Sequence, residues 1–225
     1  MKKGFTVFSV FAFILCLTIP CFAQDKWDNL LVESARVFEE MTKMPEQGIP
    51  ESLLKDAYAI AIFPSTVSGG FVFGGKYGQG AIVAKDKGKG TWSNPAVFNL
   101  AGISWGLQIG GQATDIILLI MSERGLDGLL QSKLKLGGDA AVSAGPVGRD
   151  AAAATDLQLK GGILSYSRSR GAFIGVKLEG AVISQNSEAN SDLYGSGMTA
   201  RDILINNKGT APESAGRLLS DLAKY

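Results

Sequence analysis

An arginine pair and a tyrosine occur at alternate positions near residue 168, and this spacing suits the recognition of phosphate. Tyr166, Arg168 and Arg170 would share one face of a strand, because side chains two residues apart point the same way. Planar guanidinium groups bind phosphate oxygens through paired hydrogen bonds. The stretch from Lys160 to Leu178, which includes Lys177, holds four basic residues and no acidic one. The alternative is a solvated face without a function.

Lysines form a second basic region earlier in the chain. Residues 76 to 90 carry a net charge of +3, from one aspartate and four lysines, which are Lys76, Lys85, Lys87 and Lys89. The preceding residues 25 to 56 have the opposite sign, with four basic and eight acidic side chains. The whole chain carries only +1 and shows no nucleic-acid recognition motif, so nucleic acid is not an expected partner.

Cysteine occurs only near the start of the chain, and histidine does not occur at all. The two cysteines are Cys16 and Cys21. Both fall in residues 1–23, where two lysines, an apolar run and small residues up to Ala23 predict a signal peptide. We expect cleavage after Ala23 and a periplasmic or secreted domain of residues 24–225. That domain would lack thiol or imidazole catalysis and Cys/His metal sites.

Glycine is abundant, at 29 of 225 residues against a usual ~7%. Neither of the glycine-rich phosphate-binding motifs occurs, and G-x-S-x-G is absent. Turns and close strand packing are therefore the favoured interpretation of the glycines. Catalysis by paired carboxylates stays open, although Asp115, alone in an apolar run, is more typical of a buried hydrogen-bonding group. We expect no enzyme, no cofactor and no metal.

The elements that must hold these residues follow from hydrophobic periodicity. The pattern predicts an α+β fold: a single domain with an antiparallel β-sheet or barrel-like core and helices at both chain ends. Helices are expected over 27–44, from Pro50, over 123–133 and after a capping box at Thr210 to Glu213. Strands are expected over 58–63, where Pro64 stops the run, and over 71–73, 80–84, 134–136, 140–142, 163–168 and 173–178.

Two segments allow a membrane alternative. The helix over 27–44 is amphipathic, but its polar face is acidic, which favours packing on the core over a membrane surface. Residues 97–121 contain Asp115 as their only charge and are long enough to span a bilayer. Polar residues interrupt this run repeatedly, so two consecutive buried strands are favoured.

Residues 162–171 contain a Tyr-Ser-Arg-Ser segment, and residues 175–180, Asn190 and 193–195 continue the pattern. On these residues the chain resembles the SYLF domain family, the Ysc84-type actin-binding and lipid-binding domains, as an exported bacterial member, and the Tyr-Ser-Arg-Ser segment is the most specific part. Upstream, residues 57–64, 69–70 and 108–115 match in the same order. The resemblance therefore covers nearly all of the chain after residue 23.

What this resemblance implies is a lipid-binding module, since eukaryotic members bind phosphoinositides and some bind actin filaments. The chain departs from those members in its export signal, in the absence of an SH3 or FYVE partner domain and in its acidic N-terminal helix. We therefore expect actin not to be a partner. The expected function is peripheral binding to anionic phospholipid at Arg168 and Arg170, beside Tyr166. Charge alone adds Lys177, Lys76, Lys85, Lys87 and Lys89. The alternative is an envelope protein with structural or protein-interaction roles.

Overall fold

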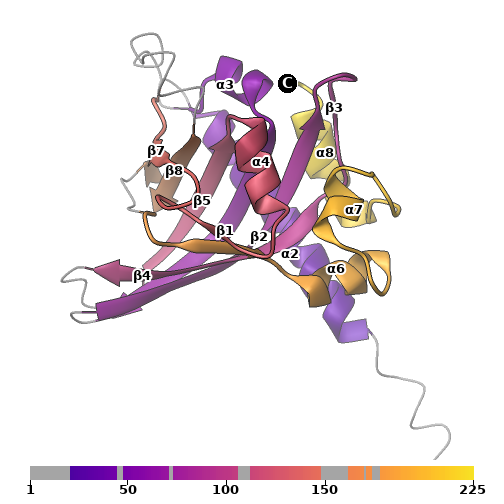
Figure 1. The fold of residues 1–225 in the computed structure, drawn as a ribbon, viewed down its shortest axis with the longest axis horizontal. Coiled ribbons are helices and arrows are strands. Elements are labelled where there is room, and N and C mark those ends of the chain that lie inside the picture. Colours follow the sequence, from indigo (N-terminus) through magenta and orange to yellow (C-terminus); the bar gives the residue numbers. More distant parts are fainter. Residues whose placement is uncertain are drawn as a thin grey trace, which may run out of the picture.

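A single α+β domain with helices at both ends of the chain and a curled, largely antiparallel sheet is seen in the computed structural model (Figure 1). The structure describes residues 21–44, 48–70, 73–105, 112–147, 162–169, 171–173 and 178–225. The predicted fold class is thereby confirmed. Most of the predicted signal peptide and parts of the expected strands over 71–73 and 173–178 lie outside the described residues, as do Arg170 and Lys177.

The sheet has ten strands, eight of which follow the order β6-β10-β4-β2-β1-β5-β8-β7, while β3 pairs with β2 and β9 with β8. Every pairing is antiparallel except that of β7 with β8. The strands are β1 (Ala59–Gly70), β2 (Phe73–Asp86), β3 (Thr91–Trp92), β4 (Ala96–Trp105), β5 (Gln112–Ile120), β6 (Leu134–Lys135), β7 (Val142–Ala144), β8 (Ile163–Ser169), β9 (Ala172–Phe173) and β10 (Val182–Gln185).

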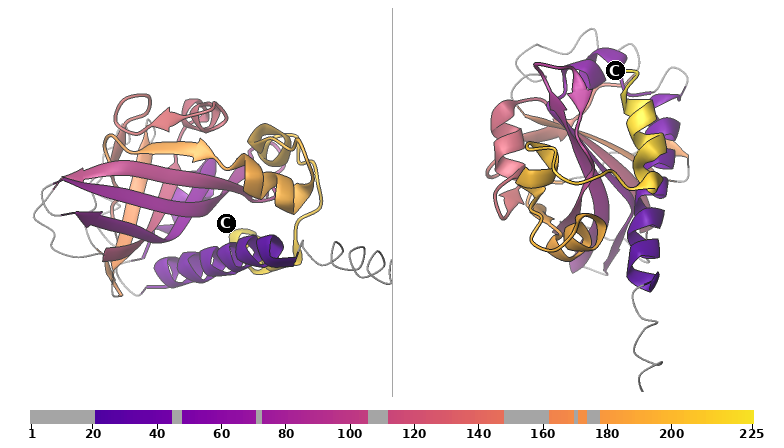
Figure 2. Two further views of the ribbon diagram at one scale, coloured as in Figure 1. Left: turned by 90° about the horizontal axis from the view of Figure 1, so that it is seen from below. Right: turned by 90° about the vertical axis from the view of Figure 1, so that its right-hand side faces the viewer.

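Helices cover both faces of this sheet. The helical elements are α2 (Cys21–Thr42), α3 (Glu51–Asp56), α4 (Glu123–Leu129), α6 (Ser187–Tyr194), α7 (Ala200–Leu204), the short 3-10 turn η2 (Glu213–Ala215) and α8 (Gly216–Leu222). Figure 2 shows α2 and α8 together on one face and α4 on the other. Leu31, Phe38 and Met41 of α2 are fully buried against the sheet, so this helix packs on the core as the periodicity favoured.

One predicted strand boundary needs correction. Pro64 does not stop β1, which continues to Gly70, because the pairing of β1 with both neighbours shifts between Ile62 and Val67. A bulge at this point accommodates the missing proline N–H, and Ser65 there adopts a positive φ of 48°. Residues 97–121 contain β4 and β5, as expected. Among the described residues, no helix is long and apolar enough to cross a membrane.

The C-terminal helices differ most from expectation. Thr210 caps no helix: the last helical segment begins after Pro212 without a side-chain cap. The capping box lies instead at Thr199 and Asp202, at the start of α7. The helix α6 was not predicted, because the residues after Asn186 are polar, although Asn186 caps it by accepting a hydrogen bond from the Ala189 N–H.

Candidate functional site

Arg168 is engaged inside the protein rather than presented to solvent. β8 pairs with β5 so that Arg168 faces Asp115, and its guanidinium donates a 2.8 Å hydrogen bond to that carboxylate. The same Nη2 lies 2.5 Å from Glu40 of α2. The Arg168 side chain is only 11% exposed and Asp115 only 15%. This ion-pair group joins the helix to the sheet, so a phosphate would have to compete with two carboxylates for Arg168.

Tyr166 lies on the same face as Arg168, as the alternating pattern predicts, but its ring is buried in the core. The hydroxyl donates a 3.1 Å hydrogen bond to the Pro146 carbonyl, and the ring meets Phe173 edge to face. Burial raises the pKa of Tyr166 well above its ordinary value. A Cβ on Gly145 would lie 2.2 Å from the tyrosine ring, so a glycine is required there.

Lys76 is also buried. It lies on β2 between Ser68 of β1 and Gly102 of β4, and desolvation lowers the pKa of its ammonium group. An ammonium that is buried in this way is not placed to reach a flat lipid surface. Lys76 and Arg168 are therefore both largely buried.

The remaining lysines converge on the turn between β2 and β3, called here the lysine turn (residues 85–90). Asp86 shapes it, because its carboxylate accepts hydrogen bonds from the N–H groups of Gly88 (2.9 Å) and Lys89 (3.1 Å). The Lys89 N–H contact is the main reason why the pKa of Asp86 is lowered. Gly90, with a φ of 72°, closes the turn. The alternating lysines of the sequence are thus held on a defined loop.

Lys85 and Lys87 connect the lysine turn to the ends of two helical segments. The Lys85 ammonium donates to the backbone oxygens of Tyr225 (2.8 Å) and Lys55 (3.1 Å), and the Lys87 ammonium donates to the Asp56 carbonyl (2.7 Å). The two ammonium groups also lie over aromatic rings, at 5.3 Å from the Trp92 centroid and 4.7 Å from that of Tyr58. Desolvation is the largest effect on both groups and lowers the pKa of each.

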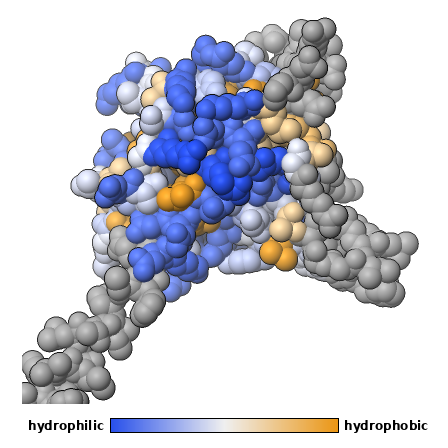
Figure 3. All heavy atoms as spheres, turned by 180° about the vertical axis from the view of Figure 1, so that it is seen from behind, coloured by the Kyte–Doolittle hydropathy of each residue, from blue (hydrophilic) through white to orange (hydrophobic). Residues whose placement is uncertain are grey.

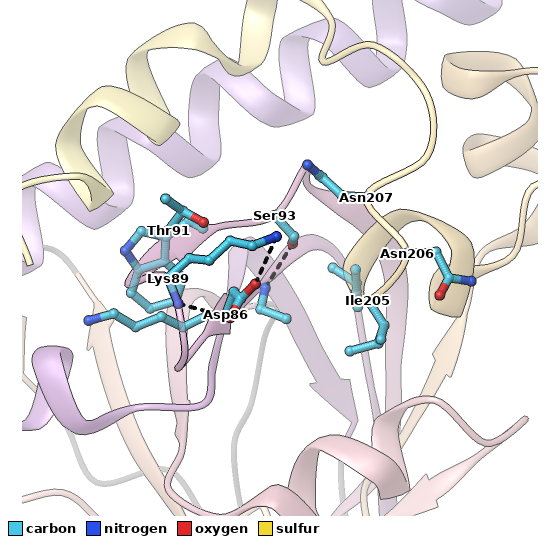
Figure 4. A pocket seen from close by; sticks show the side chains of 11 residues that line it. Asp86, Lys89, Thr91, Ser93, Ile205, Asn206 and Asn207 are labelled. Atoms are coloured by element: carbon cyan, nitrogen blue, oxygen red, sulfur yellow. Dashed lines mark hydrogen bonds and ion pairs between the residues drawn. The ribbon is translucent and has the colours of Figure 1, made fainter.

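A pocket of about 420 Å³ opens beside the lysine turn. Figure 4 shows Asp86, Lys89, Thr91 and Ser93 on its hairpin side and Ile205, Asn206 and Asn207, which follow α7, on the other. The Lys89 side chain is 79% exposed, with its ammonium 3.6 Å from Asp86. The pocket therefore combines an exposed cation, paired with Asp86, with amide and hydroxyl groups that can bind a polar ligand. The full lining is Ala84, Lys85, Asp86, Lys89, Thr91, Trp92, Ser93, Leu204, Ile205, Asn206 and Asn207.

The structure separates the predicted site residues into two groups. Lys85, Lys87 and Lys89 meet at the lysine turn, at the end of β2. Tyr166, Arg168 and Lys76 lie in the sheet and do not join them. A lipid-binding role for any of these residues stays a prediction. Sequence reasoning missed Asn206 and Asn207, which follow α7 and join the lysine turn only through tertiary packing.

The described residues offer little for catalysis or metal binding. In the described ranges, no three Asp, Glu, His or Cys side chains come together in a way that could hold a metal ion. Asp115, the candidate carboxylate, accepts hydrogen bonds from Arg168 and from the Ser65 N–H. It therefore acts as a hydrogen-bonding group of the fold.

Comparison with known proteins gives a consistent picture. Residues 101–225 match a family model named Ysc84 and described as "Las17-binding protein actin regulator". Protein YSC84 of Saccharomyces cerevisiae is 38% identical over 177 residues, covering 77% of this chain and 37% of the yeast protein. LAS seventeen-binding protein 3 of that species (strain ATCC 204508 / S288c) is 38% identical over 162 residues, covering 71% of this chain and 35% of its own length.

A human relative extends the comparison. SH3 domain-containing YSC84-like protein 1 of Homo sapiens is 30% identical over 189 residues, which cover 81% of this chain and 54% of that protein. This chain therefore spans about a third to a half of the curated relatives it matches. The expectation that actin has no part in this protein's function is wrong in the light of the family description, which is that of an actin regulator.

Proposed function

Because this chain belongs to the Ysc84 family, we propose that it is a non-enzymatic binding module that attaches to anionic phospholipid headgroups through its lysine turn. The observation that carries the proposal is the presence of three lysines, Lys85, Lys87 and Lys89, on one short turn. Lys85 and Lys89 also line a pocket that holds hydroxyl and amide groups. The family members named above are described by what they bind or regulate, which supports a binding role.

The electrostatics of the lysine turn fit a membrane surface better than a deep ligand site. The Lys89 side chain is 79% exposed, and Lys55, on α3 and paired with Glu51, adds a fourth ammonium that is half exposed. Lys87 donates to the Asp56 carbonyl and Lys85 to backbone oxygens of Lys55 and Tyr225, so these hydrogen bonds fix both ammonium groups in place. Each lysine near an anionic bilayer contributes about 1 kcal/mol, and salt screens the effect.

The test is co-sedimentation with vesicles of phosphatidylcholine alone and of phosphatidylcholine with phosphatidylglycerol. We expect binding only to the anionic vesicles, and weaker binding as salt rises. Lys87→Gln with Lys89→Gln should weaken binding by about 2 kcal/mol, roughly 30-fold, because two charges are removed. Lys26→Gln with Lys43→Gln removes two exposed charges, one on α2 and one directly after it, and should leave the affinity nearly unchanged. Equal losses in both double variants would show that net charge, and not this turn, drives binding.

A second candidate function comes from the relatives. We propose that the chain also takes part in actin regulation, as the description of its family states for that family. The chain would then co-sediment with actin filaments in the absence of lipid. The test uses protein concentrations at which vesicle binding is saturated. If the chain stays in the supernatant when actin filaments are pelleted, lipid binding is the only supported function.

A further inference from the structure

Three strands project beyond the rest of the sheet at the end opposite to the lysine turn. Among the described residues, the pairs of β10 with β4 end at Ala101, and those of β5 with β1 end at Ser68. β4 continues to Trp105, paired on its inner side with β2. We call this projection the tip, formed by residues 67–70, 73–77 and 101–105. It extends to the lower left in Figure 1.

One face of the tip is apolar and exposed. Val67 pairs with Tyr77, which pairs with Ala101, so these side chains form a row across three strands. Ile103 lies two residues beyond Ala101 on the same face and is 68% exposed. Of the five exposed large apolar side chains among the described residues, the tip holds Val67, Tyr77 and Ile103. Figure 3 shows hydrophobic surface at the lower right, on the side of the tip, next to a hydrophilic centre.

The outer edge of β4 is open at the same place. In the part of the chain that the structure describes, no strand pairs with β4 on that side between Ile103 and Trp105. Edge strands in natural proteins are usually protected by charged residues, proline or a bulge. Here the residue at the edge is an exposed isoleucine, and the register of β4 with β2 is regular from Phe73 to Ile82.

We propose that the tip is a self-association surface, where β4 of one copy pairs antiparallel with β4 of a second copy. Identical surfaces carry identical charges, so a charged edge repels its own copy. The exposed side chains of this face, Val67, Tyr77 and Ile103, are uncharged, and the whole chain carries only +1. A two-fold axis between the edges would place two apolar rows side by side and extend the sheet.

A bilayer interior fits this surface less well. Backbone N–H and C=O groups of an open edge have no partners in hydrocarbon, and each unsatisfied group costs several kcal/mol there. The tip also lies at the far end of the 14-residue strand β2 from the lysine turn, about 40 Å away at ~3.3 Å per residue. A second strand satisfies the edge, and this association does not depend on the proposed lipid binding.

The size of the surface predicts a weak dimer. Stable dimers bury about 800 Å² per partner, and a short edge with three exposed apolar side chains provides less. We therefore expect association that is visible by sedimentation velocity at several hundred micromolar and absent at low micromolar concentration. Ile103→Lys should weaken it by at least about tenfold, because it places two lysines at the two-fold axis.

The matched control is Val32→Lys on α2, which also replaces an exposed apolar side chain, 45% accessible, with a lysine. It should leave the dimer intact, and circular dichroism should show both variants folded.

Disulfide trapping tests the geometry: in a Cys16→Ser, Cys21→Ser background, Ile103→Cys should form covalent dimers on oxidation and Val32→Cys should not. A wild-type chain that is monomeric at every concentration, or a dimer that Ile103→Lys leaves unchanged, would overturn the proposal. A fluorophore on Ile103→Cys that responds to vesicles while the chain stays monomeric would assign the tip to lipid instead.

Discussion

The ion-pair group at Arg168 makes a prediction that separates a structural from a ligand-binding arginine. Arg168→Gln removes the guanidinium that links Glu40 of α2 to Asp115 of β5. Breaking a buried pair costs about 3–5 kcal/mol. Two features reduce the loss: Glu40 is 40% exposed, and Asp115 keeps the hydrogen bond from the Ser65 N–H, at 3.0 Å. We therefore expect a loss of about 2–3 kcal/mol in the free energy of unfolding.

Urea denaturation at neutral pH measures this loss directly. In a domain of this size, 1 kcal/mol corresponds to ~2–4 °C, so the melting temperature should fall by roughly 5–10 °C. Arg36→Gln is the control, because Arg36 also pairs with Glu40 but on the exposed surface of α2. Its loss should stay within about 0.5 kcal/mol. If both variants lost the same small amount, Arg168 would not be holding α2 on the sheet.

The pH dependence gives an independent check. Partial burial raises the pKa of Glu40, but hydrogen bonds from Arg168 and Arg36 outweigh this effect and leave the pKa below its ordinary value. A lowered carboxylate pKa stabilises the fold above the unfolded pKa of ~4.3, and this contribution disappears as the pH falls through the folded pKa. The difference in stability between wild type and Arg168→Gln should therefore narrow below about pH 4.

Three further predictions concern other residues. Gly80→Ala should lower the free energy of unfolding by about 3 kcal/mol in a urea titration, because its Cβ would lie 2.1 Å from the Ile62 carbonyl oxygen. Gly75→Ala is the control: a Cβ there meets open space and should change stability by less than about 0.5 kcal/mol. Asn190→Ala should cost about 2–3 kcal/mol by the same assay, since the buried amide bonds both the N–H (2.7 Å) and the C=O of Val97. Cleavage after Ala23 predicts an exported protein that begins at Gln24, and intact mass that retains residues 1–23 would contradict it.

The alternation of side chains along the sequence predicted correctly which face of a strand a residue lies on. The alternation at Tyr166 and Arg168 placed both on one face of β8 correctly. It could not supply the partners of Arg168, because Asp115 is 53 residues away and Glu40 lies on another element. The interpretation of the arginine as a phosphate ligand depended on that missing information. A planar cation in a strand suits an internal carboxylate as well as an external phosphate.

Errors at the element boundaries have a similar cause. Pro64 lacks a ladder donor, which predicts the end of a strand, but pairing on both sides of β1 carries the chain through a bulge. Thr210 and Glu213 have capping-box spacing, yet the same pattern at Thr199 and Asp202 forms the actual box. Burial does not distinguish the two positions, because Ile203 and Leu204 after Thr199 are buried and so are Leu218 and Leu222 of α8. The spacing of a cap motif therefore does not show by itself at which of two helix starts the box forms.

The arrangement of charge and apolar surface along β2 leads to a last test that joins both proposals. The lysine turn and the tip lie at opposite ends of this strand, so no single flat surface needs to contact both. The two sets of variants should then act independently at concentrations where the chain is monomeric. Ile103→Lys should leave vesicle affinity unchanged there, while Lys87→Gln with Lys89→Gln should weaken vesicle binding and leave self-association intact. At concentrations where dimers form, each dimer presents two lysine turns, so wild type should bind anionic vesicles more tightly than Ile103→Lys. If Ile103→Lys weakened the binding of the monomer to vesicles, the lysine turn and the tip would have to contact the same partner. The inference that they act independently because they lie at opposite ends of β2 would then be wrong.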